Sequence, residues 1–262
     1  MGDLMRPVSF SELVKRIFSE YKKDGSIFGI HKDQFFKKIN SDYLEIFGER
    51  SETPLGPAAG PHTQLTQNII TSWLTGGRFF ELKTVQILDT LEVPKPCIDA
   101  EDECFNTEWS TEFTLTKAYD EYLKAWFILY LMEALFDLNN SNERSFIYNM
   151  SVGYDLAGIK TDRVQAFIND MMDSSSNDKF AAYAKELQRI IDDGSFLKGT
   201  DLESKVASLK SLPGRVPARL CNQLTLSTMH GCPPKEIEDI CMYMLTEKKL
   251  NTFVKLNPTL LC

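Results

Sequence analysis

The stretch from Arg219 to Pro258 reads RLCNQLTLSTMHGCPPKEIEDICMYMLTEKKLNTFVKLNP and predicts one complete strand, helix, strand unit. Gln223 to Ser227 is a short apolar and β-branched run, and Thr252 to Leu256 is a second. Between them, apolar residues recur at the spacing of one buried helical face: Ile237, Ile240, Cys241, Met244 and Leu245. Parallel strands joined by a crossover helix build α/β sheets and barrels, so this stretch predicts an α/β fold.

The polar residues of this unit lie where α/β proteins carry out chemistry. Thr225, Thr228 and His230 gather at the carboxyl end of the first strand, and Lys255 lies near the end of the second. The carboxyl ends of parallel strands form the ligand face of open α/β sheets and of barrels. These residues are therefore candidate site residues, although polar residues at strand ends also serve only to cap loops.

Segments earlier in the chain also predict strands that end in small or polar residues. Leu55 to Pro61, L-G-P-A-A-G-P, has small residues that let the backbone approach a ligand closely. Phe79 to Val85, F-F-E-L-K-T-V, is the next predicted strand, with Lys83 and Thr84 near its end, and Phe146 to Val152 is another. Together with the two strands of the opening unit, the alternation gives about five core strands.

Helical periodicity and turn residues fill the intervals between these strands. Helices are expected over Ser9 to Tyr21, Thr63 to Trp73, Thr116 to Leu138, Asp162 to Met172 and Asp178 to Asp192. A short strand is expected at Tyr43 to Phe47, and the Pro- and acid-rich stretch from Ile87 to Leu115 predicts an inserted loop or hairpin over the strand ends. We expect an N-terminal helical extension over residues 1–40 and one barrel-type domain over residues 41–262.

Composition limits the classes of function. Hydrophobic residues make up 43% and charged residues 25% of the 262, as in soluble globular proteins, and the net charge of -8 argues against a nucleic-acid partner. No segment resembles a signal peptide or a membrane span, so a cytoplasmic location without a membrane partner is expected. The six cysteines show no C-x-x-C spacing, so no metal or cluster site is expected in this chain.

The order of these motifs resembles a known superfamily. L-G-P-A-A-G-P, F-F-E-L-K-T-V, the Asn-bearing strand, L-T-L-S-T-M-H-G and F-V-K-L-N-P-T are similar to dihydroorotate dehydrogenases, in the branch that contains dihydropyrimidine dehydrogenase. More narrowly, T-L-S-T-M-H-G-C-P-P-K-E-I and F-V-K-L-N-P-T-L-L resemble the YgfK-type proteins described as selenate reductase subunits. The resemblance covers the chain from about residue 40 onward and implies a (β/α)8 TIM barrel that holds FMN at the carboxyl ends of its strands.

The resemblance also implies roles for individual residues. Ala58, Ala59 and Gly60 would place backbone against the flavin ring, and Lys83 and Thr84 match a Lys-Thr pair that contacts it. Asn149 lies near the position of a family Asn that contacts the substrate or the ribityl chain of FMN. Thr225 occupies the Asn position of the family's N-L-S-C-P pattern, and Lys255 matches the lysine that hydrogen-bonds the N1 and O2 edge of the flavin. A cation suits that edge because reduction of the flavin leaves negative charge there.

Two departures from the family pattern concern proton transfer. Thr228 replaces the family's acid/base Cys or Ser, and Thr225 replaces its Asn. A threonine hydroxyl in an ordinary environment is a poor base, so the sequence does not support proton transfer at a pyrimidine carbon. Thr228 and His230 remain the predicted catalytic residues, with His230 or Cys232 as substitutes for the missing base.

In the family, three further strands carry the phosphate-binding glycines, and larger relatives add iron-sulfur and FAD/NAD(P)H domains. We therefore expect a partial barrel, the amino-terminal part of a flavin- and iron-sulfur-dependent oxidoreductase acting on a small-molecule substrate. On this interpretation the chain alone binds FMN weakly or not at all, and a downstream or partner chain supplies the remaining barrel and redox domains. Two alternatives stay open: a non-catalytic remnant or docking module, and a Schiff-base lyase that uses Lys255.

Overall fold

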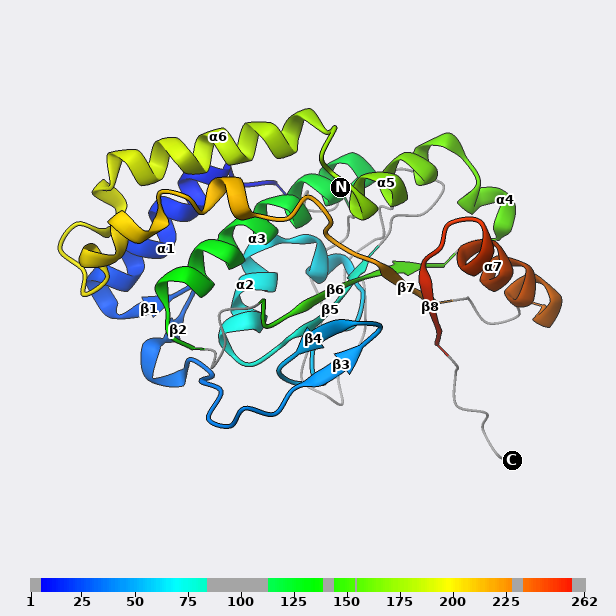
Figure 1. Cartoon of the computed structure of the whole chain (residues 1–262), viewed down its shortest axis with the longest axis horizontal. Helices are drawn as coiled ribbons and strands as arrows, with labels where there is room; N and C mark the ends of the chain where they lie inside the picture. Colours follow the sequence, from blue (N-terminus) through cyan, green and yellow to red (C-terminus); the bar gives the residue numbers. More distant parts are fainter. Residues whose placement is uncertain (1–5, 84–112, 139–143, 154, 228–232, 256–262) are drawn as a thin grey trace, which may run out of the picture.

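The structure, a computed structural model, describes residues 6–83, 113–138, 144–153, 155–227 and 233–255. Its centre is a four-stranded parallel sheet with the order β5-β6-β7-β8, shown in Figure 1. The strands are β5 (Phe79–Lys83), β6 (Ile147–Val152), β7 (Gln223–Leu226) and β8 (Asn251–Val254). Neighbours in the sheet are also neighbours in the sequence, as in the successive units of a barrel. The predicted α/β class is confirmed, and the arrangement is consistent with part of a TIM barrel.

The segment Leu55 to Pro57 takes the place of the remaining predicted strand, but it is irregular. The carbonyl of Leu55 accepts hydrogen bonds from the N–H groups of Arg78 (2.7 Å) and Phe79 (3.0 Å), and the carbonyl of Pro57 accepts from Glu81 (3.3 Å). Proline has no N–H to donate in return, so no regular ladder forms here. The segment thus runs alongside β5 through one-sided hydrogen bonds.

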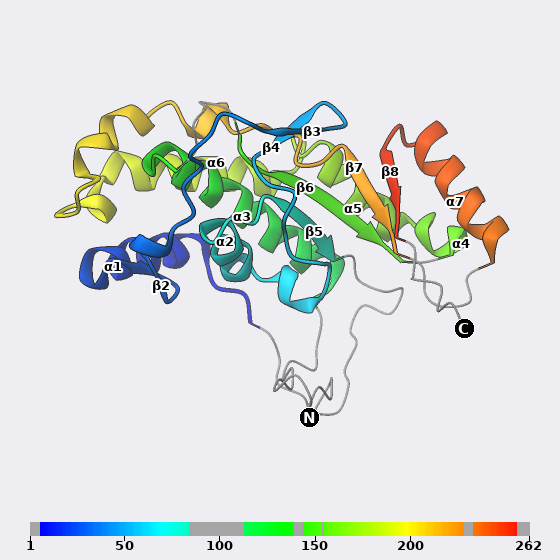
Figure 2. The same ribbon diagram turned by 90° about the horizontal axis from the view of Figure 1, so that it is seen from below.

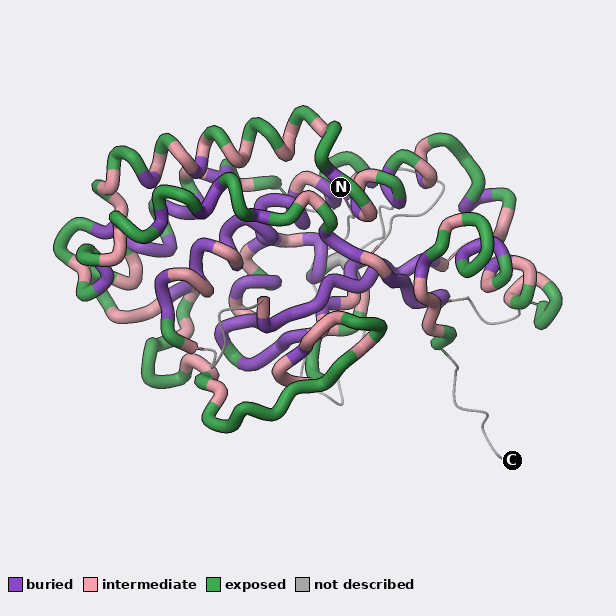
Figure 3. The backbone as a smooth tube through the Cα atoms, viewed as in Figure 1, coloured by how far each residue is buried: buried purple, intermediate pink, exposed green. Residues whose placement is uncertain are grey.

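Helices cover the sheet in layers and follow the predicted periodicity. They are α1 (Phe10–Asp24), α2 (Thr66–Leu74), α3 (Leu115–Leu135), α4 (Leu156–Ile159), α5 (Asp162–Met172), α6 (Asp178–Asp193) and α7 (Pro234–Thr246). Helix α3 packs on the sheet, and α6 packs outside it on α3 and α1. The aromatic stripe of α3 is core: the ring of Trp126 lies 4.9 Å from that of Tyr148 and 5.4 Å from that of Phe146. Burial follows the strands and α3, while the outer turns of α6 and α7 are exposed (Figure 3).

Short elements connect these layers. A two-stranded antiparallel pair, β1 (Ser26–Ile27) and β2 (Ile30–His31), follows α1. The 3-10 helices are η1 (Lys32–Gln34), η2 (Pro61–Gln64), η4 (Ser195–Leu197), η5 (Glu203–Leu209) and η6 (Pro213–Arg215). Helix α1 belongs to the same hydrophobic core as the sheet, because Phe10, Leu13 and Phe18 are buried in it. The boundary predicted at residue 40 stays a prediction.

A hairpin of β3 (Leu44–Ile46) and β4 (Glu49–Ser51) lies at the amino ends of the sheet strands. Phe47 and Gly48 form its two-residue turn with positive φ values of 50° and 78°, the backbone that such tight hairpins require. The Phe47 carbonyl accepts from the Asn222 side chain (3.4 Å), and the Phe47 ring lies 5.0 Å from the ring of Phe253. Figure 2 shows the hairpin beside β6 and β7. The strand predicted at Tyr43 to Phe47 is thus one arm of this hairpin.

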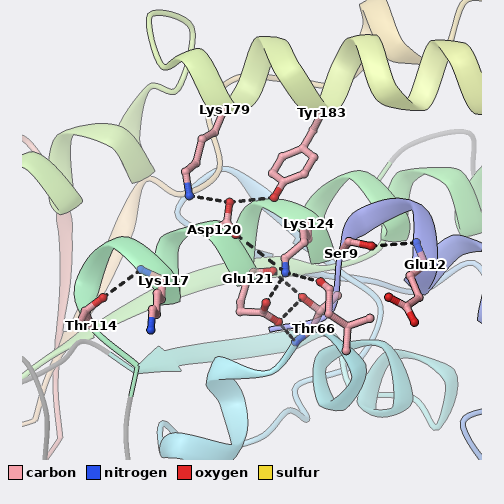
Figure 4. A network of polar contacts seen from close by, with 11 residues as sticks. Ser9, Glu12, Thr66, Thr114, Lys117, Asp120, Glu121, Lys124, Lys179 and Tyr183 are labelled. Carbon is pink, nitrogen blue, oxygen red and sulfur yellow. Dashed lines mark hydrogen bonds and ion pairs between the residues drawn. The ribbon is translucent and has the colours of Figure 1, made fainter. Parts of the chain in front are cut away.

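A buried polar network joins α2, α3 and the chain before α1 (Figure 4). The Glu121 carboxylate accepts from the Thr66 N–H (2.9 Å) and hydroxyl (2.7 Å) at the start of α2, and it pairs with the Lys124 ammonium. Lys124 also donates to the carbonyl of Val8 (2.7 Å). The carboxylate therefore supplies an acceptor to one of the N–H groups that a helix leaves unpaired at its start.

The stretch predicted as an inserted loop or hairpin lies outside the described residues until Phe113. Thr114 then caps α3, since its side chain accepts from the Lys117 N–H. Among the helices that the structure describes, none combines the length and the apolar character needed to cross a bilayer.

Candidate functional site

Alternate residues of each sheet strand face away from the helices and form an inner face. In β5, Phe80 and Leu82 enter the core, so Phe79, Glu81 and Lys83 face the other way. Strand register places Asn149 beside Glu81, Ser151 beside Lys83, and Thr225 beside Ser151. We call the polar set Glu81, Lys83, Asn149, Ser151, Thr225 and Lys255 the inner-face cluster.

The sheet curves around this face, because its first and last strands touch across it. The Lys255 ammonium, just after β8, lies 3.6 Å from the Glu81 carboxylate of β5. One layer closer to the amino ends, the rings of Phe79 and Phe253 lie 5.9 Å apart. Contacts between strands separated by two others require the curvature of a barrel wall. The inner-face cluster therefore lines a concave surface.

Glu81 is the centre of this cluster. The oxygen Oε2 that faces Lys255 also accepts a hydrogen bond from the backbone N–H of Ala59 (3.2 Å). One carboxylate thus fixes both the Ala58 to Gly60 turn and the lysine at the opposite edge of the sheet. The Lys255 side chain is 47% exposed, so the ion pair adds little stability, and its effect is to position the ammonium.

The Ala58 to Gly60 turn is held from its other side by the start of η2. The Gly60 N–H donates to the Thr63 hydroxyl (3.2 Å), which donates back to the Gly60 carbonyl (2.8 Å). The small residues predicted to approach a ligand are therefore fixed in place beside the inner-face cluster. Gly56, which precedes this turn, packs directly against the backbone of β5, since a Cβ at this position would lie 1.5 Å from the Phe79 carbonyl oxygen.

Asn149 and Thr225 form the second contact of the cluster. Asn149 is fully buried, and its side-chain Nδ2 donates to the Thr225 hydroxyl oxygen at 2.7 Å. The Lys83 backbone is held from the helix layer, because its carbonyl accepts from the Tyr122 hydroxyl (2.5 Å). Burial, hydrogen bonding and strand register thus give these side chains defined positions.

The structure brings together the predicted site residues that it describes. Ala59 and Lys255 meet on Glu81, Asn149 meets Thr225, and Lys83 lies on the same face two residues beyond Glu81. The turn at 58–60 and Lys255 thus meet on Glu81, while the roles of these residues and of Lys83 in binding FMN stay predictions. Thr84, Thr228 and His230, with the substitute base Cys232, lie outside the described residues, so their predicted roles stay predictions.

Sequence reasoning missed Glu81. An acidic residue inside a short strand suggests a solvent-facing position, and only contact with Ala59 and Lys255 shows that it faces the site. A signal was present, because Glu81 alternates with Lys83, and alternate strand residues share a face.

A groove of about 530 Å³ lies elsewhere, between α1 and the α6–η4 segment. Apolar residues such as Phe18 and Phe196 line it, together with Lys15, Lys22 and Arg189. Its basic side chains are exposed and come from helix surfaces rather than strand ends. The inner-face cluster lies at strand ends and includes the buried Asn149–Thr225 pair and the Glu81–Lys255 pair, so it is the better candidate site.

The geometry around Lys255 does not favour the Schiff-base alternative. A nucleophilic lysine is activated by desolvation in an apolar pocket or by a neighbouring cation. Lys255 is instead 47% exposed and pairs with the Glu81 carboxylate. Its position suits an ammonium that stabilises negative charge on a bound group.

Comparison with known proteins supports the motif-based resemblance. Residues 28–262 match the family described as "Oxidoreductase YgfK, N-terminal TIM-barrel domain". Over 261 residues the chain is 63% identical to proteins named "Putative oxidoreductase YgfK" from Escherichia coli strain K12 and from Escherichia coli O157:H7. The alignments cover 100% of this chain and 25% of each relative, so the chain spans a quarter of their length.

Proposed function

Because the chain belongs to the family of N-terminal TIM-barrel domains of oxidoreductase YgfK, we propose that it is the flavin-binding barrel segment of an oxidoreductase. The observation that carries the proposal is the convergence of Ala59 and Lys255 on Glu81, beside Lys83 and the Asn149–Thr225 pair. These groups lie on the concave inner face, toward the carboxyl ends of the parallel strands, where such folds bind ligands.

The groups present fit FMN in three ways. The small residues of the Ala58 to Gly60 turn offer backbone without bulky side chains. Lys83 and Lys255 offer positive charge from two edges of the sheet. The inner face also carries buried acceptor oxygens, on Glu81 and Asn149, that have no hydrogen-bond partner in the described part of the chain. A planar group with donor and acceptor edges would satisfy these atoms.

Each residue then has a definite task. Lys255, positioned by Glu81, would hold an ammonium near a bound flavin and stabilise the negative charge gained on reduction, and Lys83 would add to the same field. Asn149 donates to the Thr225 oxygen, which leaves the Thr225 hydroxyl proton to donate to a ligand. When bound, FMN would supply hydride or single-electron transfer, which protein side chains do not provide.

We further propose that the substrate is a small molecule, and that FAD, iron-sulfur clusters and the NAD(P)H site belong to other parts of a longer protein. Of the cysteines that the structure describes, Cys221 is buried and bonded to the Gln223 carbonyl (2.8 Å), and burial raises its pKa to about 12. It is therefore a packed thiol rather than a thiolate ligand. We propose for that longer protein either a selenate reductase activity or an activity like that of dihydropyrimidine dehydrogenase.

The test is FMN binding by this chain and by the matched variants Lys83→Met, Lys255→Met and Lys210→Met. Lys210 is an exposed lysine that follows η5 and lies outside the inner-face cluster, so its variant controls for loss of one charge. Ligand-detected NMR reports weak affinities, and we expect Lys83→Met and Lys255→Met each to weaken FMN binding about tenfold or more. Equal affinity in all four proteins would contradict the assigned site. If this chain alone does not bind FMN, the same variants are compared in a longer protein that carries the remaining barrel strands, and absence of binding there would favour a non-catalytic module.

A further inference from the structure

Two acceptor oxygens of the inner-face cluster have no hydrogen-bond partner among the described residues. They are Oε1 of Glu81 and Oδ1 of Asn149, and both atoms are buried. The two residues are direct register partners on β5 and β6, and both side chains face the same side of the sheet. Asn149 is fully buried, and the Glu81 side chain is 12% exposed.

Their orientations are fixed by the opposite atom of each side chain. Glu81 uses Oε2 for the Ala59 N–H and the Lys255 ammonium, and Asn149 uses Nδ2 for the Thr225 hydroxyl. The remaining oxygens cannot turn away without breaking these contacts. An unpaired buried acceptor destabilises a protein by about 1–3 kcal/mol, and more if it is charged, so two neighbouring ones point to a ligand that pairs with them.

A metal cation does not suit this pair of acceptors. The Lys255 ammonium already lies 3.6 Å from Glu81 and balances its charge. A second cation in contact with Glu81 would be repelled by that ammonium at short range. The complement is a neutral group that donates hydrogen bonds.

We infer that Glu81 Oε1 and Asn149 Oδ1 form an acceptor pair that recognises an N–H edge of the bound ligand. This inference rests on the proposed function, and it makes that function specific. The oxidised flavin ring of FMN carries one N–H, at N3, which the two oxygens would share, with the charged Glu81 as the stronger acceptor. Glu81 is then a specificity-determining residue as well as the residue that positions Lys255.

The experiment compares FMN with 3-methyl-FMN, in which a methyl group replaces the N3 hydrogen. Both flavins are titrated against the unmodified chain, Glu81→Ala, Glu81→Gln and Glu45→Ala, with ligand-detected NMR as the readout. Glu45 lies on the exposed hairpin strand β3, and its variant is the control for loss of a carboxylate. Circular dichroism establishes that each variant is folded.

We expect the unmodified chain to bind FMN about 10- to 100-fold more tightly than 3-methyl-FMN, the range for a hydrogen bond to a charged group. In Glu81→Ala the preference should fall toward one, because the acceptor is gone. Glu81→Gln keeps a carbonyl acceptor without the charge, so its preference should lie between the two. Glu45→Ala should retain the full preference. If Glu81→Ala does not fold, a reduced preference in Glu81→Gln carries the same conclusion.

Two results would overturn the inference while the proposed function stands. One is FMN binding with no preference over 3-methyl-FMN. The other is a preference that persists unchanged in Glu81→Ala or Glu81→Gln, since the methyl group would then be excluded by shape alone. Failure to bind either flavin, both by this chain and by a longer protein that supplies the remaining barrel strands, is a different outcome, which removes the proposed function itself.

Discussion

The carboxylate of Glu133 lies among charged groups at the amino end of β6. It accepts hydrogen bonds from the Ser145 backbone N–H (3.0 Å) and from the Ser145 hydroxyl. Burial raises its pKa to about 7, although the bonds from Ser145 and the charges of Arg78 and Arg144 lower it in part. The folded protein therefore holds a proton on Glu133 at pH values where the unfolded chain has released it.

The sign of the resulting pH dependence follows from this raised pKa. Between the ordinary value near 4.5 and the folded value of about 7, the folded state binds more protons, so the free energy of unfolding falls as the pH rises. Glu133→Gln keeps an acceptor for Ser145 without the charge, and we expect it to gain stability relative to the unmodified chain by roughly 1–3 kcal/mol from pH 5 to pH 8. Urea unfolding at several pH values measures this. Glu247→Gln, on an exposed residue, should show no such trend.

Gly56 marks the closest approach of the irregular segment to β5. A Cβ at this position would lie 1.5 Å from the Phe79 carbonyl oxygen and 2.4 Å from its carbonyl carbon, and backbone cannot move aside as a flexible side chain would. We expect Gly56→Ala to reduce the free energy of unfolding by about 3 kcal/mol or more. Gly214→Ala, where a Cβ meets nothing within 4 Å, is the matched control. Equal thermal stability of the two variants would contradict this account.

For single residues, the sequence predicted which part of the fold a side chain occupies better than it predicted which other residues that side chain contacts. Lys83 and Lys255 were assigned to the site from their places near strand ends, and the structure puts both on the inner face. Glu81 was missed, because its partners Ala59 and Lys255 are distant along the chain. Local patterns carry the alternation of a strand, but the contact across a curved sheet depends on how all of its strands twist.

Among the elements, α2 depends on a residue of α3. Glu121 is fully buried, accepts from Thr66 at the first turn of α2 and pairs with Lys124. Removing one member of a buried ion pair leaves the other charge without compensation. We expect Glu121→Ala to reduce the free energy of unfolding by about 3–5 kcal/mol.

The double variant Glu121→Leu with Lys124→Met separates the charge effect from packing. It removes both charges and keeps most of the side-chain volume, so we expect it to be more stable than Glu121→Ala. Asp137→Ala, at an exposed carboxylate that pairs with Lys205, is the control and should change stability by less than about 1 kcal/mol. Chemical denaturation of the four proteins decides the matter. A double variant no more stable than Glu121→Ala would show that the charges were not responsible.

Elements whose apolar residues recur at a regular spacing were predicted closely. Elements whose conformation depends on contacts with distant parts of the chain were not. Helix α5 begins and ends at the predicted residues, because its apolar residues recur regularly between polar caps. The segment at Leu55 to Pro61 was expected to end a strand, but its prolines prevent a two-sided ladder. The hairpin turn at Phe47 and Gly48 was also missed, since only Gly48 is a usual residue for positive φ.

At the scale of the whole molecule, the two edges of the sheet differ: the segment Leu55 to Pro57 runs alongside β5, whereas the β8 edge is exposed to solvent. Within the described residues β8 pairs only with β7, and nearby apolar side chains are accessible: Met242 (52%), Leu245 (49%) and Val254 (39%). Edge strands with exposed apolar residues tend to pair with other chains. We expect this chain to self-associate as its concentration rises.

Sedimentation velocity over a range of concentrations tests this expectation. Val254→Lys and Leu245→Lys should shift the chain toward monomer, because a charge at this edge opposes pairing. Ile39→Lys is the control, since Ile39 is 94% exposed and belongs to no strand. A monomer at every concentration, or an equal effect of Ile39→Lys, would refute the role of the β8 edge.

The hairpin at Phe47 has a consequence for biosynthesis. It is made early, yet its carbonyl partner Asn222 follows 175 positions later, and its ring partner Phe253 later still. While the ribosome is still translating the middle of the chain, the Phe47 ring has nothing to dock on. The aromatic tip thus reaches its folded contacts only after β8 has been made, and even then Phe47 remains 46% exposed.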